Sequence, residues 1–525
     1  MKIIQISKKK IRTLLLGTAS VCTVLLSACG GASEPEVPKG SQESVSTTQN
    51  RDMLRVAVDK NITTINGING TAQGFTPAYH IFDVLCALTP DMSLRPNLAT
   101  QWEQIDDFTW RFHLREGVKF HDGSDFNAES AAYSINYIAN MEPTYAIAGQ
   151  WATSWPPEGV AIDSYTLDVV TPQPNLKLPE LLNRCPMLPL DAVESNADFF
   201  KAPVGTGPYK FVSWDAGVSV KLEANPDYWD GKPAIKNLVF DIIGDGEARM
   251  NALKSGEYDY VMGVTYDLAN EMKNSSDEFA MELDINESTG HNFAYFNYQS
   301  DNPFIRNPEF RKAMQYAVDS QGIVDAILEN WVSLSRGIAP QNVAGSIDAG
   351  GFPGRDLEKA KQIATECGYN GEEISFYYAN EEFTRALEVS EILCAQLQEA
   401  GFNVVFEQVD GASWDQIKAS GIWDIALNKL GGTYTGDSEI YYTQSLKKQY
   451  WNLDEADAMI SSIYQTGITP EKREETLKHV QQYCWEQAPF LWATDNILLC
   501  ARDRTLKGVE VVPLGLYRFT YAYYE

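Results

Sequence analysis

Ile374-Ser-Phe-Tyr-Tyr378 is the stretch that decides the fold, because it begins a run in which apolar strands alternate with helical patterns. A long amphipathic helix is expected over Asn380–Ala400, and Gly401 is placed to end it. Two more strands are expected at Phe402–Val409 and Ile422–Leu427. Strands and helices that alternate in this way are typical of an α/β unit with a mostly parallel sheet.

A second unit of the same kind is expected earlier in the chain. It has a strand at Leu238–Ile243, a helix at Glu247–Lys254 and another strand at Tyr258–Met262. Two parallel strands joined by a helix normally form a right-handed crossover, so this region predicts a second, separate α/β sheet. The chain has 525 residues, more than one hydrophobic core usually supports, and two or more lobes are therefore expected.

Three loops at strand ends form the expected ligand-binding region. Ligands of open α/β sheets bind outside the carboxyl ends of the strands. In this chain the rule selects Asp59–Pro77, Met262–Asp267 and Asn428–Asp437. If two lobes face one another, these loops line one cleft. The aromatic side chains near them could grip a solute, although each is equally a candidate for core packing.

The first fifty residues have the composition of an export signal followed by a tether. Basic residues precede the apolar run Leu14–Leu26, which is the layout of a secretory signal and too short to span a bilayer comfortably. Leu26-Ser-Ala-Cys29 resembles a bacterial lipobox, and the resemblance implies cleavage before Cys29 and lipidation of that residue. Residues 1–28 are thus expected to be the signal peptide and 29–50 a lipidated flexible tether. An ordinary signal with an incidental cysteine is the alternative.

Composition limits the classes of function that remain. The net charge is -29, which argues against nucleic acid as a partner, because that affinity comes from basic contacts. The cysteines form no CxxC pair, so they predict buried small side chains and not a zinc or redox motif, with one or two disulfides as the alternative in an exported protein. No GxSxG, HExxH, Walker or GxGxxG motif opens a helix or follows a strand. We therefore expect a binding protein with no catalytic residues, no cofactor and no metal site.

Four motifs in a fixed order carry a family resemblance. They are Pro96-Asn-Leu-Ala-Thr-Gln-Trp102 with Phe112-His-Leu-Arg-Glu-Gly-Val-Lys-Phe-His-Asp-Gly123; Pro203-Val-Gly-Thr-Gly-Pro-Tyr209; Asn225-Pro-Asp-Tyr-Trp-Asp-Gly-Lys-Pro233; and Asn307-Pro-Glu-Phe-Arg-Lys-Ala313 with Ala317-Val-Asp319. Together they closely resemble the extracellular solute-binding proteins of family 5, the peptide and nickel receptors of ABC importers. The similarity runs from about Leu54 to Leu516, nearly the whole chain after the signal.

The resemblance implies an α/β fold, a two-lobed clamp like the type II periplasmic binding proteins, with an extra β-rich subdomain. Lobe I would comprise residues 51–88, 198–292 and 492–525, the subdomain residues 89–197, and lobe II residues 293–491. Hinge crossings are expected near Ile285–Asn297 and Phe490–Asp495.

The resemblance also implies a function and partners. The expected protein is a monomeric, lipid-anchored receptor on the extracytoplasmic face of the cell membrane. It would capture a small solute, predicted to be a peptide, and deliver it to an ABC permease and ATPase. A nickel-chelate receptor, an oligosaccharide receptor or a tethered sensor of the same fold are the alternatives.

The family's peptide-amine anchor is missing from its usual position. In the oligopeptide receptors an aspartate follows a strand like Trp423–Leu427, and the match places Thr433 there. Asp437 comes a few residues later in the same loop. It is expected either to bind the ligand's amine or to cap the next helix.

The nickel-type receptors suggest a second charged candidate. They use an arginine, and Arg184 lies one position from the match, where it could bind a ligand carboxylate with two hydrogen bonds. Ser438 stands where their histidine ligand would sit, which favours a peptide over a nickel chelate. The complete set of expected ligand-binding residues is Arg184, Asp437, Tyr434, Asn428, Phe75 and Tyr79.

Overall fold

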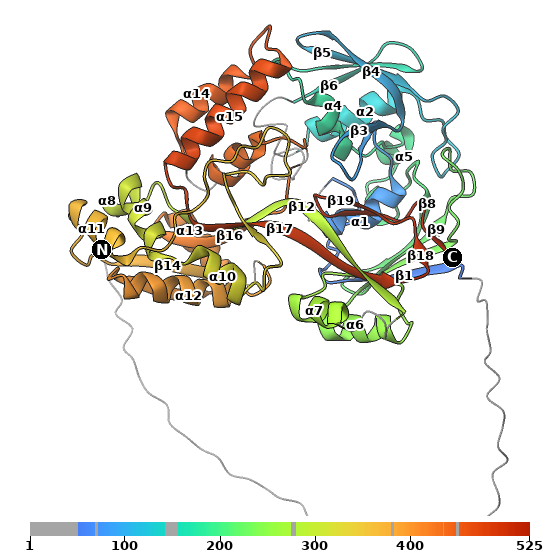
Figure 1. The fold of residues 1–525 in the computed structure, drawn as a ribbon. Coiled ribbons are helices and arrows are strands. Elements are labelled where there is room, and N and C mark those ends of the chain that lie inside the picture. Colours follow the sequence, from blue (N-terminus) through green and yellow to red (C-terminus); the bar gives the residue numbers. More distant parts are fainter. Residues whose placement is uncertain are drawn as a thin grey trace, which may run out of the picture. The chain divides into compact units, whose positions relative to one another are not determined.

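The computed structural model describes residues 51–68, 72–141, 156–274, 280–379, 383–433, 435–447 and 451–525. Cys29 with its lipobox, the tether and Tyr434 lie outside these residues. The chain divides into residues 1–50 and a unit of Arg51–Glu525, and every strand and helix below belongs to this unit (Figure 1).

One large sheet organises the unit, where two separate sheets were expected. Its strands are β1 (Met53–Val58), β8 (Tyr209–Asp215), β9 (Ser219–Ala224), β10 (Asn237–Ile242), β11 (Tyr260–Met262), β12 (Met281–Phe296), β13 (Ser333–Leu334), β14 (Ile374–Ala379), β15 (Val404–Val409), β16 (Ile425–Leu430) and β17 (Phe490–Asp503). The order across the sheet is β15-β14-β16-β12-β17-β11-β1-β10-β9-β8, with β13 beside β17.

The long strands β12 and β17 join the two halves of this sheet. They pair antiparallel with each other, and the register shifts between Glu287 and His291. Strand β17 also pairs with β11, at Cys500–Arg502, whereas β12 pairs with β16, at His291–Phe296. We term β1 and β8–β11, with the helices and segments that pack on them, the first half, and β14–β16, with theirs, the second half. The segments expected to carry the hinge lie on β12 and β17.

Both expected α/β units are present, one in each half. In the first half β1 lies between β10 and β11 and is parallel to both, with α6 (Gly246–Lys254) before β11 and α7 (Tyr266–Asn274) after it. In the second half β14 lies between β15 and β16 and is parallel to both. Helix α12 (Ala386–Glu399) begins six residues after the expected start at Asn380, which lies outside the described residues.

The other helices of the second half are short or medium in length. They are α8 (Pro303–Arg306), α9 (Pro308–Ala317), α10 (Ser320–Ala326), α11 (Leu357–Glu366), α13 (Gly411–Ser420), the π-helical η3 (Tyr441–Leu446), α14 (Asp454–Ser462) and α15 (Pro470–Glu486). They share one core with β12 and β17, whose largest buried side chains include Trp423, Trp451 and Trp492.

A separate four-stranded antiparallel sheet lies within residues 89–197, the span expected to form the extra subdomain. Its order is β4 (Ala99–Asp106), β5 (Thr109–Leu114), β7 (Thr166–Val170) and β6 (Glu158–Ala161). Helix α2 (Ala128–Ala139) packs on it and begins as expected after Asn127, whose side chain accepts a hydrogen bond from the N–H of Ser130 at 3.0 Å.

Smaller elements surround these sheets. They are α1 (Ala72–Ile81), β2 (Cys86–Leu88), β3 (Leu94–Pro96), α4 (Leu178–Leu181), η1 (Leu182–Arg184), α5 (Leu190–Ser195), η2 (Phe199–Lys201), β18 (Leu506–Lys507), β19 (Glu510–Val512), β20 (Leu516–Arg518) and β21 (Tyr523–Tyr524). Among the described residues, no helix combines the length and hydropathy that a membrane span requires. The six described cysteines are free thiols, and five of them are buried.

Three of the four family motifs meet at the end of α1, around Asp83. Its buried carboxylate accepts hydrogen bonds from Thr206 of the second motif and from Tyr228 and Trp229 of the third, at 3.1, 3.1 and 2.9 Å. The side chain of Asn97, from the first motif, is also a donor to it. Burial raises the pKa of Asp83, and these donors oppose that rise by stabilising the ionised form. The motifs are thus far apart in the sequence but supply one buried hydrogen-bond network.

The glycines of the second motif lie directly against the end of α1. The N–H of Gly207 donates to the carbonyl of Ile81 at 2.9 Å, which satisfies one of the carbonyls that a helix end leaves unpaired. A Cβ atom on Gly205 would lie 2.1 Å from the same Ile81 oxygen. Only a residue without a side chain allows this approach.

The fourth motif has a structural role in the second half. Arg311 is fully buried and donates hydrogen bonds to the carbonyls of Ile305, Gln487 and Ala488. Burial lowers its pKa to about 9, and its guanidinium also lies 4.8 Å from the ring centre of Trp451. Arg311 therefore fixes α9 against the segment that leads into β17.

Candidate functional site

A cavity of about 1000 Å³, part of it open to solvent, lies at the carboxyl ends of the strands. All three expected loops contribute to it, through Asp59 and Lys60 after β1, Gly263 after β11, and Lys429 near the end of β16. Asn292 of β12 and Asn496 of β17 also line it, and the Nδ2 atom of Asn496 donates to the Oδ1 atom of Asn292 at 3.0 Å. The strand-end rule therefore located a real cavity that both halves of the sheet share.

Three of the expected ligand-binding residues form one group in the first half. Phe75 and Tyr79 lie one turn apart on α1, with ring centres 6.3 Å apart in an edge-to-face arrangement. Arg184 ends η1, and its guanidinium carbon lies 4.6 Å from the ring centre of Phe75. Arg184 is only 3% exposed, so its charge lies in a largely desolvated place. This is a suitable environment for a strong, directional contact with a carboxylate.

The loop after β16 reaches from the second half to the apolar cluster around Phe75. That cluster also contains Leu514 and has Met92 packed against it. A Cβ atom on Gly432 would lie 3.3 Å from the Cα atom of Leu514, and one on Gly436 would lie 3.2 Å from the carbonyl oxygen of Met92. The loop that carries Asp437 and the group that carries Arg184 therefore belong to one interface between the two halves.

Thr289 ties this interface to the register shift of β12. Its N–H donates to the carbonyl of Pro513 at 3.1 Å, and its side-chain oxygen accepts from the N–H of Thr433 at 3.2 Å. The hydroxyl of Tyr441 donates to the backbone carbonyl of Thr289. Thr433, which occupies the family's amine-anchor position, is fully buried and takes part in this backbone network.

Asp437 has a cationic partner within the protein. Its carboxylate is 4% exposed and forms an ion pair with Arg473 of α15, which also pairs with Glu439 at 2.7 Å. Burial lowers the pKa of Arg473, but the two carboxylates outweigh it and hold that pKa above its ordinary value. The cluster of Asp437, Glu439 and Arg473 holds two acidic groups against one basic group.

Asp437 also makes a local backbone contact, but it does not cap η3, whose N-cap is Ile440 without a side-chain hydrogen bond. Its Oδ1 atom accepts a hydrogen bond from the N–H of Glu439 at 3.1 Å, in the turn that leads into η3. At the same time Asp437 and Arg473 line a cavity of about 820 Å³, together with Trp110 and Leu477. A ligand group in this cavity would meet the acidic cluster.

Asn428 was expected in the loop after the strand, but it lies within the strand itself. It lies in β16 opposite Phe293, and its Oδ1 atom accepts from the N–H of Lys429 at 2.8 Å. Lys429 is the residue of β16 that lines the cavity at the strand ends. Tyr434, the remaining expected residue, lies outside the described part of the chain.

Sequence reasoning missed Thr289, Asn292 and Asn496, and no spacing signal pointed to them. They belong to strands that the sequence presents as mixed polar and apolar runs, and only the pairing of β12 with β17 brings them together. Within the described ranges, no group of three or more histidine, cysteine, aspartate and glutamate side chains could hold a metal ion.

The chain belongs to the family described as bacterial extracellular solute-binding proteins, family 5 Middle, whose model matches residues 93–452. Two curated relatives are similar over most of their length. The glutathione-binding protein GsiB of Pectobacterium atrosepticum is 24% identical over 466 residues, covering 85% of this chain and 88% of the relative. The protein of the same name from Escherichia coli K12 is 23% identical over 482 residues, covering 87% and 92%.

Solved structures agree with this fold. The ABC transporter substrate binding protein CtaP of Listeria monocytogenes superimposes with a TM-score of 0.80 at 22% identity, covering 90% of this chain and 99% of that one. DppA of Helicobacter pylori in complex with the peptide STSA gives 0.76 at 20% identity, covering 90% and 98%. NikZ of Campylobacter jejuni in complex with Ni(L-His) gives 0.74 at 22% identity, covering 90% and 97%. The fold is thus that of a two-lobed, periplasmic-binding-protein-like receptor.

Proposed function

We propose that this protein is the substrate-binding receptor of an ABC importer and that its solute is a short peptide or a related amino-acid-derived compound. The observation that carries the proposal is the placement of opposite charges at one interface. Arg184 lies in the first half, and the acidic cluster around Asp437 lies in the second. A peptide with free termini offers a carboxylate to the first and an amine to the second.

The energetics of desolvation favour such a ligand over a neutral one. Arg184 is buried, so a solute group placed against it loses its water, and an anionic group recovers that cost through charge-assisted hydrogen bonds that a neutral group cannot make as strongly. The excess acidic group of the Asp437 cluster would favour a ligand amine in the same way. The relatives named as glutathione-binding proteins and the neighbour solved with a peptide support this class of solute.

Capture would require the two halves of the sheet to act as lobes. In this proposal the lobes have the boundaries expected from the sequence, and β12 and β17 carry the hinge between them. Closure brings the loop after β16 against Met92 and Leu514, as in the described structure, and buries the solute at that interface.

The experiment that tests the function is a ligand panel read by thermal shift and small-angle scattering. The panel contains a tripeptide with free termini, glutathione, a nickel–histidine chelate and a neutral oligosaccharide. The free peptide should stabilise the protein by about 2.7 kcal/mol at a concentration 100 times its Kd. It should also reduce the radius of gyration. Stabilisation by the oligosaccharide or the chelate alone would contradict the peptide assignment.

We also propose that Cys29 anchors the receptor to the outer face of the membrane, since several acyl chains on one residue give firm attachment. Replacing Cys29 with serine should leave the protein unlipidated, in soluble or unprocessed form. Membrane fractionation combined with the mass of the mature protein measures both properties. A variant that stays membrane-bound and is processed normally would show that the anchor is elsewhere.

A further inference from the structure

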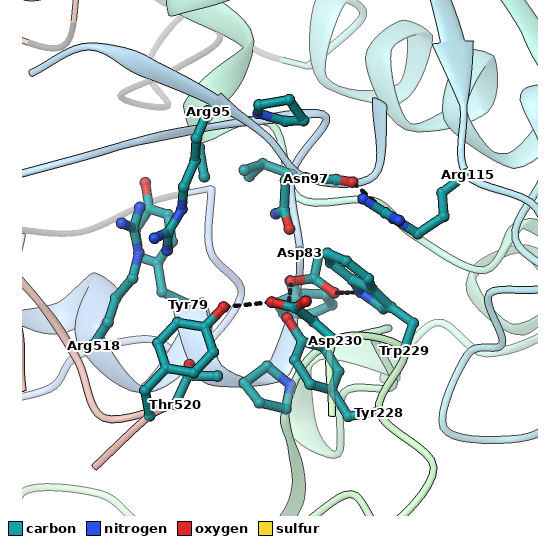
Figure 2. A pocket seen from close by; sticks show the side chains of 16 residues that line it. Tyr79, Asp83, Arg95, Asn97, Arg115, Tyr228, Trp229, Asp230, Arg518 and Thr520 are labelled. Atoms are coloured by element: carbon teal, nitrogen blue, oxygen red, sulfur yellow. Dashed lines mark hydrogen bonds between the residues drawn. The ribbon is translucent and has the colours of Figure 1, made fainter. Parts of the chain in front are cut away.

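A cavity near the end of α1 combines basic, acidic and aromatic side chains (Figure 2). It encloses about 650 Å³, part of it open to solvent. Three arginines and two aspartates line it, namely Arg95, Arg115, Arg518, Asp83 and Asp230. Asp437 is not part of its lining, and among the described residues predicted to bind the ligand, Tyr79 alone borders it.

Arg518 is the most informative of these residues. It is 8% exposed, and its Nη1 atom donates to the carbonyl of Leu88 and lies 3.6 Å from Glu510. Its other two nitrogens have no acceptor among the described residues, and Figure 2 shows its guanidinium beside that of Arg95, among the residues that line the cavity. A nearly buried guanidinium with donors left over is a prepared place for an anionic group.

Arg95 adds a second positive charge next to Arg518. Its guanidinium binds both carboxylate oxygens of Glu510, each at 3.0 Å. Arg95 and Arg518 therefore share one carboxylate. Burial and the charge of Arg95 both lower the pKa of Arg518, which means that its cationic form is held at a cost that a bound carboxylate would relieve.

Arg115 adds donors from another part of the wall. Its guanidinium lies 4.2 Å from the ring centre of Trp229, and its Nε atom donates to the carbonyl of Asn97 at 3.2 Å. Its terminal nitrogens have no acceptor in the part of the chain that the structure describes. Stacking on Trp229 fixes the guanidinium plane, so these donors need little further ordering to meet a ligand.

The acidic side of the cavity suits a cation. Asp83 is saturated by hydrogen bonds from its neighbours, whereas the exposed carboxylate of Asp230 receives one, from the hydroxyl of Tyr521. Neither aspartate has an ion pair with a described lysine, arginine or histidine. The rings of Trp229 and Tyr521 also line the cavity, and aromatic faces attract ammonium groups.

We propose that this cavity binds a small zwitterion of the amino-acid type, with its carboxylate on Arg518 and its ammonium group beside Asp230. The wall charges match both ends of such a molecule, whereas a simple anion would meet the two aspartates unfavourably. This would be a second site, with a different charged lining, that shares Tyr79 with the peptide site proposed above.

Ligand-observed NMR titration of the full mature chain tests this proposal, with glycine, N-acetylglycine and glycinamide as probes. Glycine carries both charges, and each of the other two lacks one. The wild-type protein should bind glycine at least about tenfold more tightly than either derivative. Equal binding of all three probes, or no binding of glycine, would overturn the proposal.

Two matched variants locate the binding. Asp230→Asn should weaken glycine binding about tenfold, because it removes the charge that faces the ammonium group. Asp227→Asn is the control, since Asp227 is an exposed acid of the same loop and does not line the cavity. Arg518→Gln should abolish the preference for glycine over glycinamide. Equal glycine affinities in the Asp230 and Asp227 variants would place the zwitterion elsewhere, even if Arg518→Gln fails to fold.

Discussion

Replacing Arg184 with alanine should weaken the binding of a short peptide with a free carboxyl terminus by about 2–5 kcal/mol, the usual loss when one partner of a buried charge pair is removed. The reason is the environment of the side chain. Arg184 is 3% exposed and lies over Phe75, so water cannot replace the lost contact at low cost. Isothermal calorimetry with the wild type and the variant measures the difference.

The peptide's carboxyl-terminal amide separates recognition from structural damage. If Arg184 binds the carboxylate, the wild type should prefer the acid to the amide, and Arg184→Ala should lose that preference. Arg184→Lys keeps the charge but lacks the two-pronged geometry, so it should recover only part of the affinity. Arg306→Ala, at an exposed arginine of α8, is the matched control. A wild type that binds acid and amide equally would exclude a carboxylate role for Arg184.

The second large effect is expected in stability and not in binding. Gly205→Ala should destabilise the protein by about 3 kcal/mol or more, at the upper end of the range for overpacked sites. The new Cβ atom would lie 2.1 Å from the carbonyl oxygen of Ile81 and 2.9 Å from the ring of Phe82. The carbonyl belongs to the end of α1 and cannot turn aside, because it accepts the N–H of Gly207.

Gly244→Ala provides the comparison for this prediction. Its Cβ atom would meet nothing within 4 Å, and its backbone is outside the left-handed region. The stability of this variant should stay within about 0.5 kcal/mol of the wild type. Urea unfolding followed by circular dichroism measures both changes. Equal midpoints for the two variants would mean that α1 and the Gly205 turn can separate at little cost.

The α/β units could be predicted because their signals are local. In the first half a strand, a helix and a second strand follow within about thirty residues, and the helix has the acidic N-cap Asp245. In the second half the same order holds, although the start of α12 carries no side-chain cap. The single sheet was missed for the opposite reason. Strand β12 carries Glu282, Asp284 and Glu287 in its first part, so its sequence does not predict one continuous buried strand. Its identity depends on pairing with β17, far away in the sequence.

The site was predicted in part. Features set by nearby residues could be predicted, whereas contacts between residues far apart in the sequence could not. The loops at the strand ends came from a general rule, and Phe75, Tyr79 and Arg184 do lie together. The partner of Asp437 could not be predicted, because Arg473 belongs to α15 and no periodic pattern links the two. The ligand roles of these residues remain predictions.

The position of β17 determines the order in which the molecule can assemble. Tyr295 of β12 pairs with Phe490 of β17, and Met281 pairs with Asp503, so these contacts join positions about 200 residues apart. Local strands of each half can gather early, but β11 and β12 keep open edges until the last strand is available. Closing such long loops is entropically costly and slow. The central sheet therefore closes only after synthesis has passed β17, and Phe490–Asp503 completes the connection between its halves.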